Sequence, residues 1–234
     1  MTNKHSKSNY FENQPNPGNF VSRLSLKVRQ KMFYKLMEVT QANSMTKVLD
    51  VGVTVDKRDE SNFFEKMYPY PGNITAVGLE DASFLTDKFK GLTFIKADGL
   101  KLPFADNSFD LVTSFAVIEH VGCHQNQEKY VTELCRVGKS CFISTPNRWY
   151  PIEVHTVLPL IHWLPAIVHR KILKIIGMPF YSEERNLNLL DEKILLNFFP
   201  ENMAVNPYHY RLFGIVSNLL FYGKKPFDKS ITKH

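Results

Sequence analysis

The stretch ADGLKLPFADNSFDLVTSFAVIEHV, residues Ala97–Val121, decides the fold of this 234-residue chain. It opens on an acidic turn and passes through the turn residues Asp-Asn-Ser at 106–108. It then enters the apolar run LVTSF at 111–115, and Glu-His follows at 119 and 120. A short β-rich run bounded by turn residues is typical of a buried strand. The stretch therefore predicts such a strand, with polar side chains just beyond its end.

Similar runs lie on both sides of this stretch. They are TKVLDVGV at 46–53, ITAVGLED at 74–81, LTFIKAD at 92–98 and KSCFISTP at 139–146. Residues 127–137 have helical spacing, and apolar residues recur every three or four positions over 19–39. Strands that alternate with helices at this rhythm predict βαβ units and a parallel sheet covered on both faces. The fold class is therefore α/β and doubly wound.

The sequence changes character after Pro146. Residues 147–185 are dense in aromatic side chains, prolines and histidines and lack the regularity of a sheet unit, so we interpret them as a lid insertion. Residues 189–199 favour a helix, and the strands near 206–211 favour a closing antiparallel hairpin. We divide the chain into an N-terminal helical segment, 1–45, and one domain, 46–234, that carries the lid.

Composition limits the class of protein. Hydrophobic residues make up 44% and charged residues 22%, close to globular averages, which excludes a disordered, collagen-like or coiled-coil chain. The net charge of +6 favours anionic partners without naming one. Three cysteines without CxxC spacing indicate reduced thiols. The first 18 residues lack the apolar core of a signal peptide, and prolines and histidines interrupt the apolar residues 154–168, so we expect a cytoplasmic protein.

The side chains at the strand ends form one candidate site, because open α/β sheets bind ligands at the carboxyl ends of their strands. Gly52 would let the backbone approach a ligand closely, and Glu80 could accept both hydroxyls of a ribose. Asp98 could accept hydrogen bonds from an adenine amino group, and Phe115 could lie against the adenine face. Asp50 ends the first of these strands.

At these residues, from about Thr46 to Pro146, the chain resembles the class I S-adenosylmethionine-dependent methyltransferases, in particular the methyltransferase domain type 11 family. The resemblance implies a Rossmann-like, mostly parallel seven-stranded sheet and S-adenosylmethionine as cofactor. It implies that Asp98 and Gly99 meet the adenine, that Glu80 meets the ribose, and that Asp50 and Gly52 meet the methionine end. It places Phe115 near the adenine or the sulfonium.

The first loop departs from the family pattern. The family usually has Asp-x-Gly-x-Gly-x-Gly, whereas residues 50–56 read DVGVTVD and keep only the first glycine. Thr54 and Asp56 could instead offer side-chain oxygens to the ammonium group of the cofactor. The chief alternative function is therefore a methyltransferase-like binding or scaffold domain without catalytic activity.

Transfer of a sulfonium methyl group mainly requires an acceptor held in line with the leaving sulfur. A hydroxyl acceptor must also lose its proton, for which histidine is suited. His120 and His155 are the candidate catalytic bases, Glu153 is a weaker one, and no metal site is expected. The alternative is a purely structural role, in which these histidines cap a helix or pack against their neighbours.

The expected reaction is O-methylation of a small-molecule, glycan or lipid-linked acceptor. In the lid, Trp149 and Trp163 could stack on sugar faces, and residues 170–174 carry basic side chains that suit weak contact with an anionic membrane. A dinucleotide-dependent oxidoreductase is disfavoured because G-x-G-x-x-G is absent. No nucleic-acid partner is expected, since the Asn/Asp-Pro-Pro-aromatic run of base-modifying methyltransferases is also absent.

Overall fold

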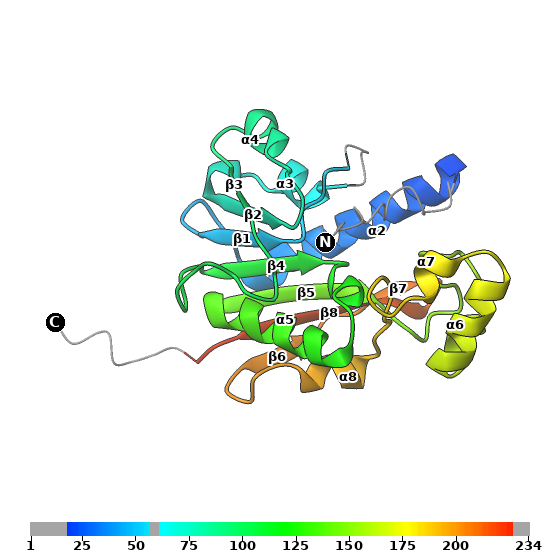
Figure 1. The fold of residues 1–234 in the computed structure, drawn as a ribbon. Coiled ribbons are helices and arrows are strands. Elements are labelled where there is room, and N and C mark those ends of the chain that lie inside the picture. The colour runs from blue at the N-terminus through cyan, green and yellow to red at the C-terminus, as the bar shows by residue number, and fades with distance from the viewer. Residues whose placement is uncertain (1–17, 57–60, 227–234) are drawn as a thin grey trace, which may run out of the picture.

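The computed structural model describes residues 18–56 and 61–226, which form an eight-stranded sheet between two layers of helices (Figure 1). The strand order is β3-β2-β1-β4-β5-β8-β6, and β7 pairs with β8. The parallel strands are β1 (Val48–Val51), β2 (Ile74–Gly78), β3 (Thr93–Lys96), β4 (Leu111–Phe115) and β5 (Ser140–Pro146). The predicted doubly wound, mostly parallel sheet is confirmed.

The antiparallel end of the sheet is also confirmed, with one strand more than predicted. β8 (Ile215–Lys224) runs antiparallel to β5 and to β6 (Ala204–Pro207). The added strand is β7 (Tyr210–Leu212), which forms a hairpin with β8. Phe213 and Gly214 between them both have positive φ, the backbone of a type I′ hairpin turn. Phe-Gly is an unusual pair for that turn, which usually contains Asn-Gly, so residues 213 and 214 carry no usual signal of it.

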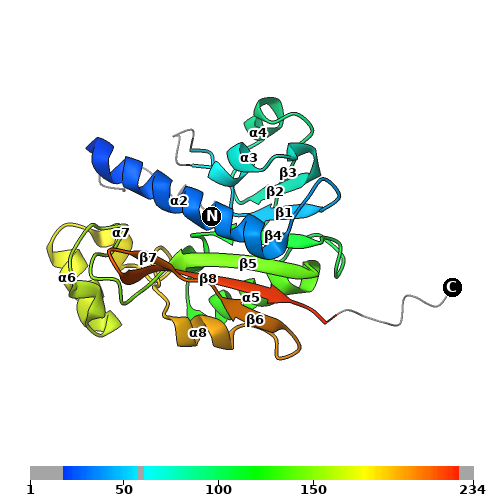
Figure 2. The same ribbon diagram turned by 180° about the vertical axis from the view of Figure 1, so that it is seen from behind.

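Helices cover both faces of the sheet, as the two opposite views show (Figures 1 and 2). On one face lie α5 (His124–Val137) and α8 (Glu192–Asn197), whose apolar side chains join those of Leu49 and Val51. On the other face lie α2 (Gly18–Thr40), α3 (Phe63–Met67) and α4 (Phe84–Lys88), which pack near Val48. This split follows from the alternation of side chains along a strand. One consequence is that Asp50 faces the layer that contains α3.

The predicted helices match α2 and α5 closely. Val28, Met32 and Leu36, spaced four residues apart, are buried on the inner side of α2, as the periodicity predicted. Phe20, which belongs to the same pattern, lies outside the described side chains. The helix predicted over 189–199 is shorter, because α8 begins after Asp191, whose carboxylate accepts a hydrogen bond from the backbone N–H of Ile194.

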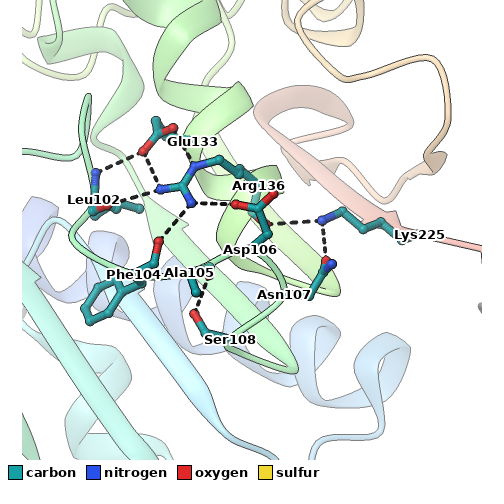
Figure 3. A network of polar contacts seen from close by, with 9 residues as sticks. All are labelled: Leu102, Phe104, Ala105, Asp106, Asn107, Ser108, Glu133, Arg136 and Lys225. Atoms are coloured by element: carbon teal, nitrogen blue, oxygen red, sulfur yellow. Dashed lines mark hydrogen bonds and ion pairs between the residues drawn. The ribbon is translucent and has the colours of Figure 1, made fainter. Parts of the chain in front are cut away.

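The connection between β3 and β4 is held by Arg136 of α5 (Figure 3). Its guanidinium donates to the backbone oxygens of Leu102 (3.1 Å) and Phe104 (2.8 Å) and to the carboxylates of Asp106 and Glu133. Glu133 in turn accepts the Leu102 N–H at 2.9 Å. The segment LPFADNSF, part of the stretch that carries the resemblance, is therefore fixed by one partly exposed network of charge-assisted hydrogen bonds.

The lid lies beyond the carboxyl ends of β4 and β5 (Figure 1). It contains η3 (Ile161–Trp163), α6 (Ala166–Ile175) and α7 (Pro179–Ser182), and it has a small core of its own around Leu173 and Tyr181. Two further short helices are η1 (Pro71–Asn73) and η2 (Ile118–His120). Within residues 18–56 and 61–226, no helix is long and apolar enough to cross a membrane. The division of the chain at residues 45 and 46 stays a prediction.

Candidate functional site

The predicted cofactor residues lie along one edge of the sheet, as the strand register shows. Gly78 of β2 pairs with Lys96 of β3, and Glu80 and Asp98 each follow two residues later. Asp50 of β1 pairs with Thr113 of β4, and Phe115 ends β4 two residues beyond. Asp50, Gly52, Glu80, Asp98 and Phe115, which we call the strand-end group, therefore follow one another across β3, β2, β1 and β4. This is the edge where open α/β sheets bind ligands.

Asp50 is buried and faces a second carboxyl group. Its Oδ1 accepts a hydrogen bond of 2.5 Å from the Thr113 hydroxyl, and Glu65 of α3 lies on its other side. Burial raises the pKa of Asp50 to about 6, although Glu65 and Thr113 lower it in part. Burial and the charge of Asp50 raise the pKa of Glu65 well above its usual value. The pair therefore retains a proton under conditions in which exposed carboxyl groups are ionised.

Sequence analysis missed Glu65. It lies in α3, a helix of five residues, and its side chain is 1% exposed between the buried Phe64 and the strand ends. A glutamate in a short segment rich in aromatic and charged residues is normally a surface residue. Only the fold brings it against Asp50, so no local signal distinguishes it.

The loop after β1 turns sharply at Gly52. Its φ is +115°, and a Cβ atom there would lie 2.2 Å from Cγ2 of Val117, so a side chain would fit neither the backbone nor the space. Val53 is buried in the core beside α3. Thr54 is held by Asn62, whose side chain accepts the Thr54 N–H and donates to its carbonyl oxygen. These two hydrogen bonds fix the loop, which lacks the second and third glycines of the family pattern.

Asp98 and Gly99 form a tight turn after β3. The Asp98 carboxylate is exposed and accepts the N–H of Leu100 at 2.9 Å. A Cβ atom on Gly99 would lie 2.5 Å from the ring of Tyr130, which is buried and hydrogen-bonded to Ser114 of β4. Glycine at 99 therefore lets α5 pack closely while the Asp98 carboxylate remains accessible.

Phe115 belongs to an aromatic cluster on the α2 side of the sheet. Its ring centroid lies 4.9 Å from that of Phe63, 6.0 Å from that of Phe64 and 5.7 Å from that of Phe142. The side chain is nevertheless only half-buried. Phe115 thus packs in the core and still reaches the edge of the sheet.

The two predicted catalytic histidines come together although they are 35 positions apart in the sequence (155 − 120 = 35). The ring centroids of His120 and His155 lie 4.9 Å apart, in an edge-on arrangement. Glu119 Oε1 lies 3.8 Å from Nε2 of each ring. Nδ1 of His155 lies 2.6 Å from Glu153 Oε1. We call Glu119, His120, Glu153 and His155 the His-Glu cluster.

Burial and charge set the protonation of this cluster. Burial, with a contribution from His155, lowers the pKa of His120 to about 3. Burial also opposes charging of His155, but Glu153 and Glu119 outweigh it and raise the pKa of His155. The pKa of Glu153 falls to about 2 despite burial, because His155 and Thr156 stabilise its ionised form. Glu119 is fully buried, and burial raises its pKa.

The segment that follows the lid holds the cluster against the sheet. The backbone oxygen of Asn186 lies 2.7 Å from Nδ1 of His120, and the N–H of Asn188 donates to the backbone oxygen of Glu119 at 2.8 Å. The buried side chain of Gln127 in α5 donates to the backbone oxygens of Ile118 and Asn188. Residues of η2, of α5 and of the segment after the lid thus meet at the position where β4 ends.

This sheet order, with the antiparallel strand β8 beside β5, is the Rossmann-like fold that solved class I methyltransferases also have. A family model described as "Methyltransferase domain" matches residues 58–141. The similarity to that family therefore covers residues 58–141.

Individual known proteins are similar to this chain over different lengths. Norajmaline N-methyltransferase of Rauvolfia serpentina is 40% identical over 63 residues, which is 27% of this chain and 20% of the relative. The chain thus matches about a fifth of that curated relative's length. The YcgJ protein of Bacillus subtilis is similar in fold, with a TM-score of 0.56 and 14% identity over 85% of this chain and 100% of that one. N-methyltransferase NodS of Bradyrhizobium japonicum, solved with S-adenosyl-L-homocysteine, has a TM-score of 0.54 and 11% identity over 85% and 87%.

Proposed function

We propose that this protein transfers a methyl group from S-adenosylmethionine to an oxygen atom of a small-molecule, glycan or lipid-linked acceptor. The observation that carries the proposal is that the strand-end group and the His-Glu cluster lie at one edge of the sheet. The acceptor oxygen forms a bond to the methyl carbon, the bond from that carbon to sulfur breaks with its electron pair left on sulfur, and the acceptor loses a proton. The products are the methyl ether or ester and S-adenosylhomocysteine.

The strand-end group supports the cofactor half of the proposal. We propose that Asp98 and Gly99 receive the adenine and that Glu80 receives the ribose hydroxyls, because both carboxylates follow paired strand ends. The Asp50–Glu65 pair, together with Gly52, would receive the methionine end, whose positive charge compensates buried carboxylates.

Two further residues complete the proposed cofactor site. The Thr54 hydroxyl accepts the Asp56 N–H at 3.1 Å and has its own proton to donate to the cofactor. Phe115 would form the wall beside the adenine or the sulfonium, where its half-buried ring reaches the sheet edge.

The His-Glu cluster supports an oxygen acceptor. A neutral amine can attack the methyl group through its lone pair, whereas a hydroxyl needs a group that helps it to lose its proton. His120 and His155 are the groups that we propose for activating the acceptor oxygen, and both lie directly beyond the end of β4. Transfer to nitrogen, the activity named for two of the similar proteins, is the outcome that would contradict this part.

The lid surface supports a glycan or lipid-linked acceptor. Trp149 and Trp163 are 48% and 41% exposed and lie near each other, so their faces are available for stacking on sugars. On α6, Ile167 and Ile175 are largely exposed, as is the basic Lys171. This combination fits weak peripheral contact with an anionic membrane. Of the other predicted basic residues, Arg170 pairs with Glu184 and Lys174 with Glu183.

Titration calorimetry with S-adenosylmethionine tests the cofactor half. Binding at micromolar to millimolar concentration is expected, and no heat at millimolar cofactor would favour the inactive binding or scaffold domain. Incubation with labelled cofactor and panels of hydroxylated and amine acceptors, followed by NMR of the product, tests the other half. A methyl group found on nitrogen would refute the oxygen acceptor. Flotation with anionic vesicles should show binding that salt weakens, and equal flotation with neutral vesicles would contradict the membrane contact.

A further inference from the structure

Three side chains of the His-Glu cluster present metal-ligand atoms to one point. Glu119 Oε1, one ring nitrogen of His120 and one of His155 lie within 4.8 Å of one another. Glu119 and His120 belong to η2, which begins directly beyond β4, whereas His155 comes from the lid. The sequence therefore does not show the cluster, because two ligands are adjacent and the third lies 35 positions later.

The partner groups orient both imidazoles toward Glu119. Nδ1 of His120 lies 2.7 Å from a backbone oxygen, which can only accept, so this nitrogen carries the proton. Nδ1 of His155 likewise lies 2.6 Å from a carboxylate oxygen of Glu153. In the neutral form of both rings this places the lone pair on Nε2, the atom that lies 3.8 Å from Glu119 Oε1. Metal-bound histidines in proteins are oriented in the same way, by a carbonyl or carboxylate on the second ring nitrogen.

Glu119 supplies an independent observation. Its side chain is 0% exposed, and Oε2 accepts a hydrogen bond of 2.9 Å from Thr145. Oε1 is buried without a hydrogen-bond partner. A distance of 3.8 Å is too long for a hydrogen bond to either imidazole. A buried carboxylate oxygen without a donor is costly, and a cation bound at this point would compensate it.

We propose that Glu119, His120 and His155 bind a divalent transition-metal ion of the Zn²⁺ class. Two imidazoles and one carboxylate suit Zn²⁺, Fe²⁺ or Co²⁺ and do not suit Mg²⁺ or Ca²⁺, which prefer oxygen ligands. Ligand atoms around a tetrahedral ion with bonds of about 2.1 Å lie about 3.4 Å apart. The two distances of 3.8 Å from Glu119 exceed this by a few tenths of an ångström, and the two ring nitrogens lie within 4.8 Å of each other.

A metal ion with three protein ligands keeps an open coordination position, the pattern of catalytic sites. The catalytic role of the ion rests on the proposed function. An acceptor hydroxyl bound at the open position would ionise at a lower pH, and its proton would pass to solvent. Binding of the ion itself does not depend on the methyl-transfer reaction. The two proposals can therefore fail separately.

The test is titration of the chelator-treated full-length protein with ZnCl₂ in a calorimeter and with CoCl₂ in a visible spectrometer. A single tight equivalent and the absorption of tetrahedral Co²⁺ are expected. Glu119→Gln and His155→Ala should each weaken binding at least tenfold, and Glu153→Gln, which changes the carboxylate beside Nδ1 of His155, by about 10–100-fold. His124→Ala, the same change at an exposed histidine, should bind like the wild type. Circular dichroism of each variant checks that it folds.

Two results would overturn the metal site. They are absence of a tight equivalent in the wild type, and unchanged affinity in folded Glu119→Gln. Either result would leave the cluster as an imidazolium at His155 between two carboxylates. S-adenosylmethionine binding by the same chelator-treated protein is measured in parallel. Cofactor binding without metal binding refutes only this inference, whereas metal binding without cofactor binding refutes only the proposed function.

Discussion

Replacing Asp50 with asparagine should make the protein more stable, and the gain should grow with pH. The ordinary pKa of the aspartate carboxyl is 3.8, and burial raises that of Asp50 to about 6 in the folded protein. Below pH 3.8 the carboxyl is protonated in both the folded and the unfolded chain. Between pH 3.8 and 6 mainly the unfolded chain releases the proton, so the free energy of unfolding falls as the pH rises. Above pH 6 both states are ionised and the loss is complete.

The size of the effect follows from the two pKa values. Their difference corresponds to a loss of unfolding free energy on the order of 3 kcal/mol at pH 8 relative to low pH. Roughly 1.5 kcal/mol of this loss is already present at pH 5. Asparagine has nearly the same shape, and its oxygen can still accept the Thr113 hydroxyl while its amide donates to Glu65. Asp50→Asn should therefore be more stable than the wild type by about 3 kcal/mol at pH 8 and by about 1.5 kcal/mol at pH 5.

Urea denaturation at 25 °C, followed by far-ultraviolet circular dichroism, measures the free energy of unfolding at both pH values. The matched control is Asp98→Asn, which makes the same change at an exposed carboxylate of the same sheet edge and should shift stability by less than about 0.5 kcal/mol. A difference between Asp50→Asn and the wild type that does not change with pH would refute the reasoning. It would mean that Asp50 and Glu65 do not titrate as a buried pair.

Three other substitutions test the site and the fold. Asp98→Ala should weaken S-adenosylmethionine binding more than tenfold in calorimetry through the lost polar contact with the adenine, and unchanged affinity would remove Asp98 from the site. Gly52→Ala should lower the midpoint of urea unfolding by an amount equivalent to about 2–3 kcal/mol, because its methyl group would overlap Val117 at a φ of +115°. A wild-type midpoint would show that the loop can move away. Arg136→Ala should cost about 1–2 kcal/mol in the same assay, since it leaves Glu133 and two backbone oxygens without their donor in a partly exposed network, and an unchanged midpoint would contradict the role given to this network.

The sequence predicted the parallel sheet well because each strand is a short β-rich run bounded by turns. Residues 111–115 and 140–146 are buried over nearly their whole length, as such runs predict. The order of the strands places Asp50, Glu80 and Asp98 along one edge, so three separate local patterns predicted one candidate site. The hairpin of β7 and β8 was harder to place, because a two-residue turn of Phe-Gly carries no usual turn signal.

Contacts between distant segments could not be predicted. Glu65 meets Asp50 only because α3 packs on the sheet, and His155 meets His120 only because the lid folds back over the end of β4. The two hydrogen bonds from the Asn62 side chain to Thr54, which hold the loop that lacks the family's later glycines, could not be predicted either. Asparagine is common in turns, so its presence at 62 does not mark this contact. In each case the interaction depends on tertiary packing and not on local propensity.

The way Arg136 secures the segment LPFADNSF has a consequence for evolution of this fold. Its side chain donates to two backbone oxygens and to the Asp106 carboxylate of that segment, and none of these groups belongs to the strand-end group or the His-Glu cluster. Selection for folding alone would thus preserve the segment in a descendant that had lost catalysis. A match to this segment therefore reports the fold, whereas the proposed chemistry depends on Asp98, Glu119 and His155.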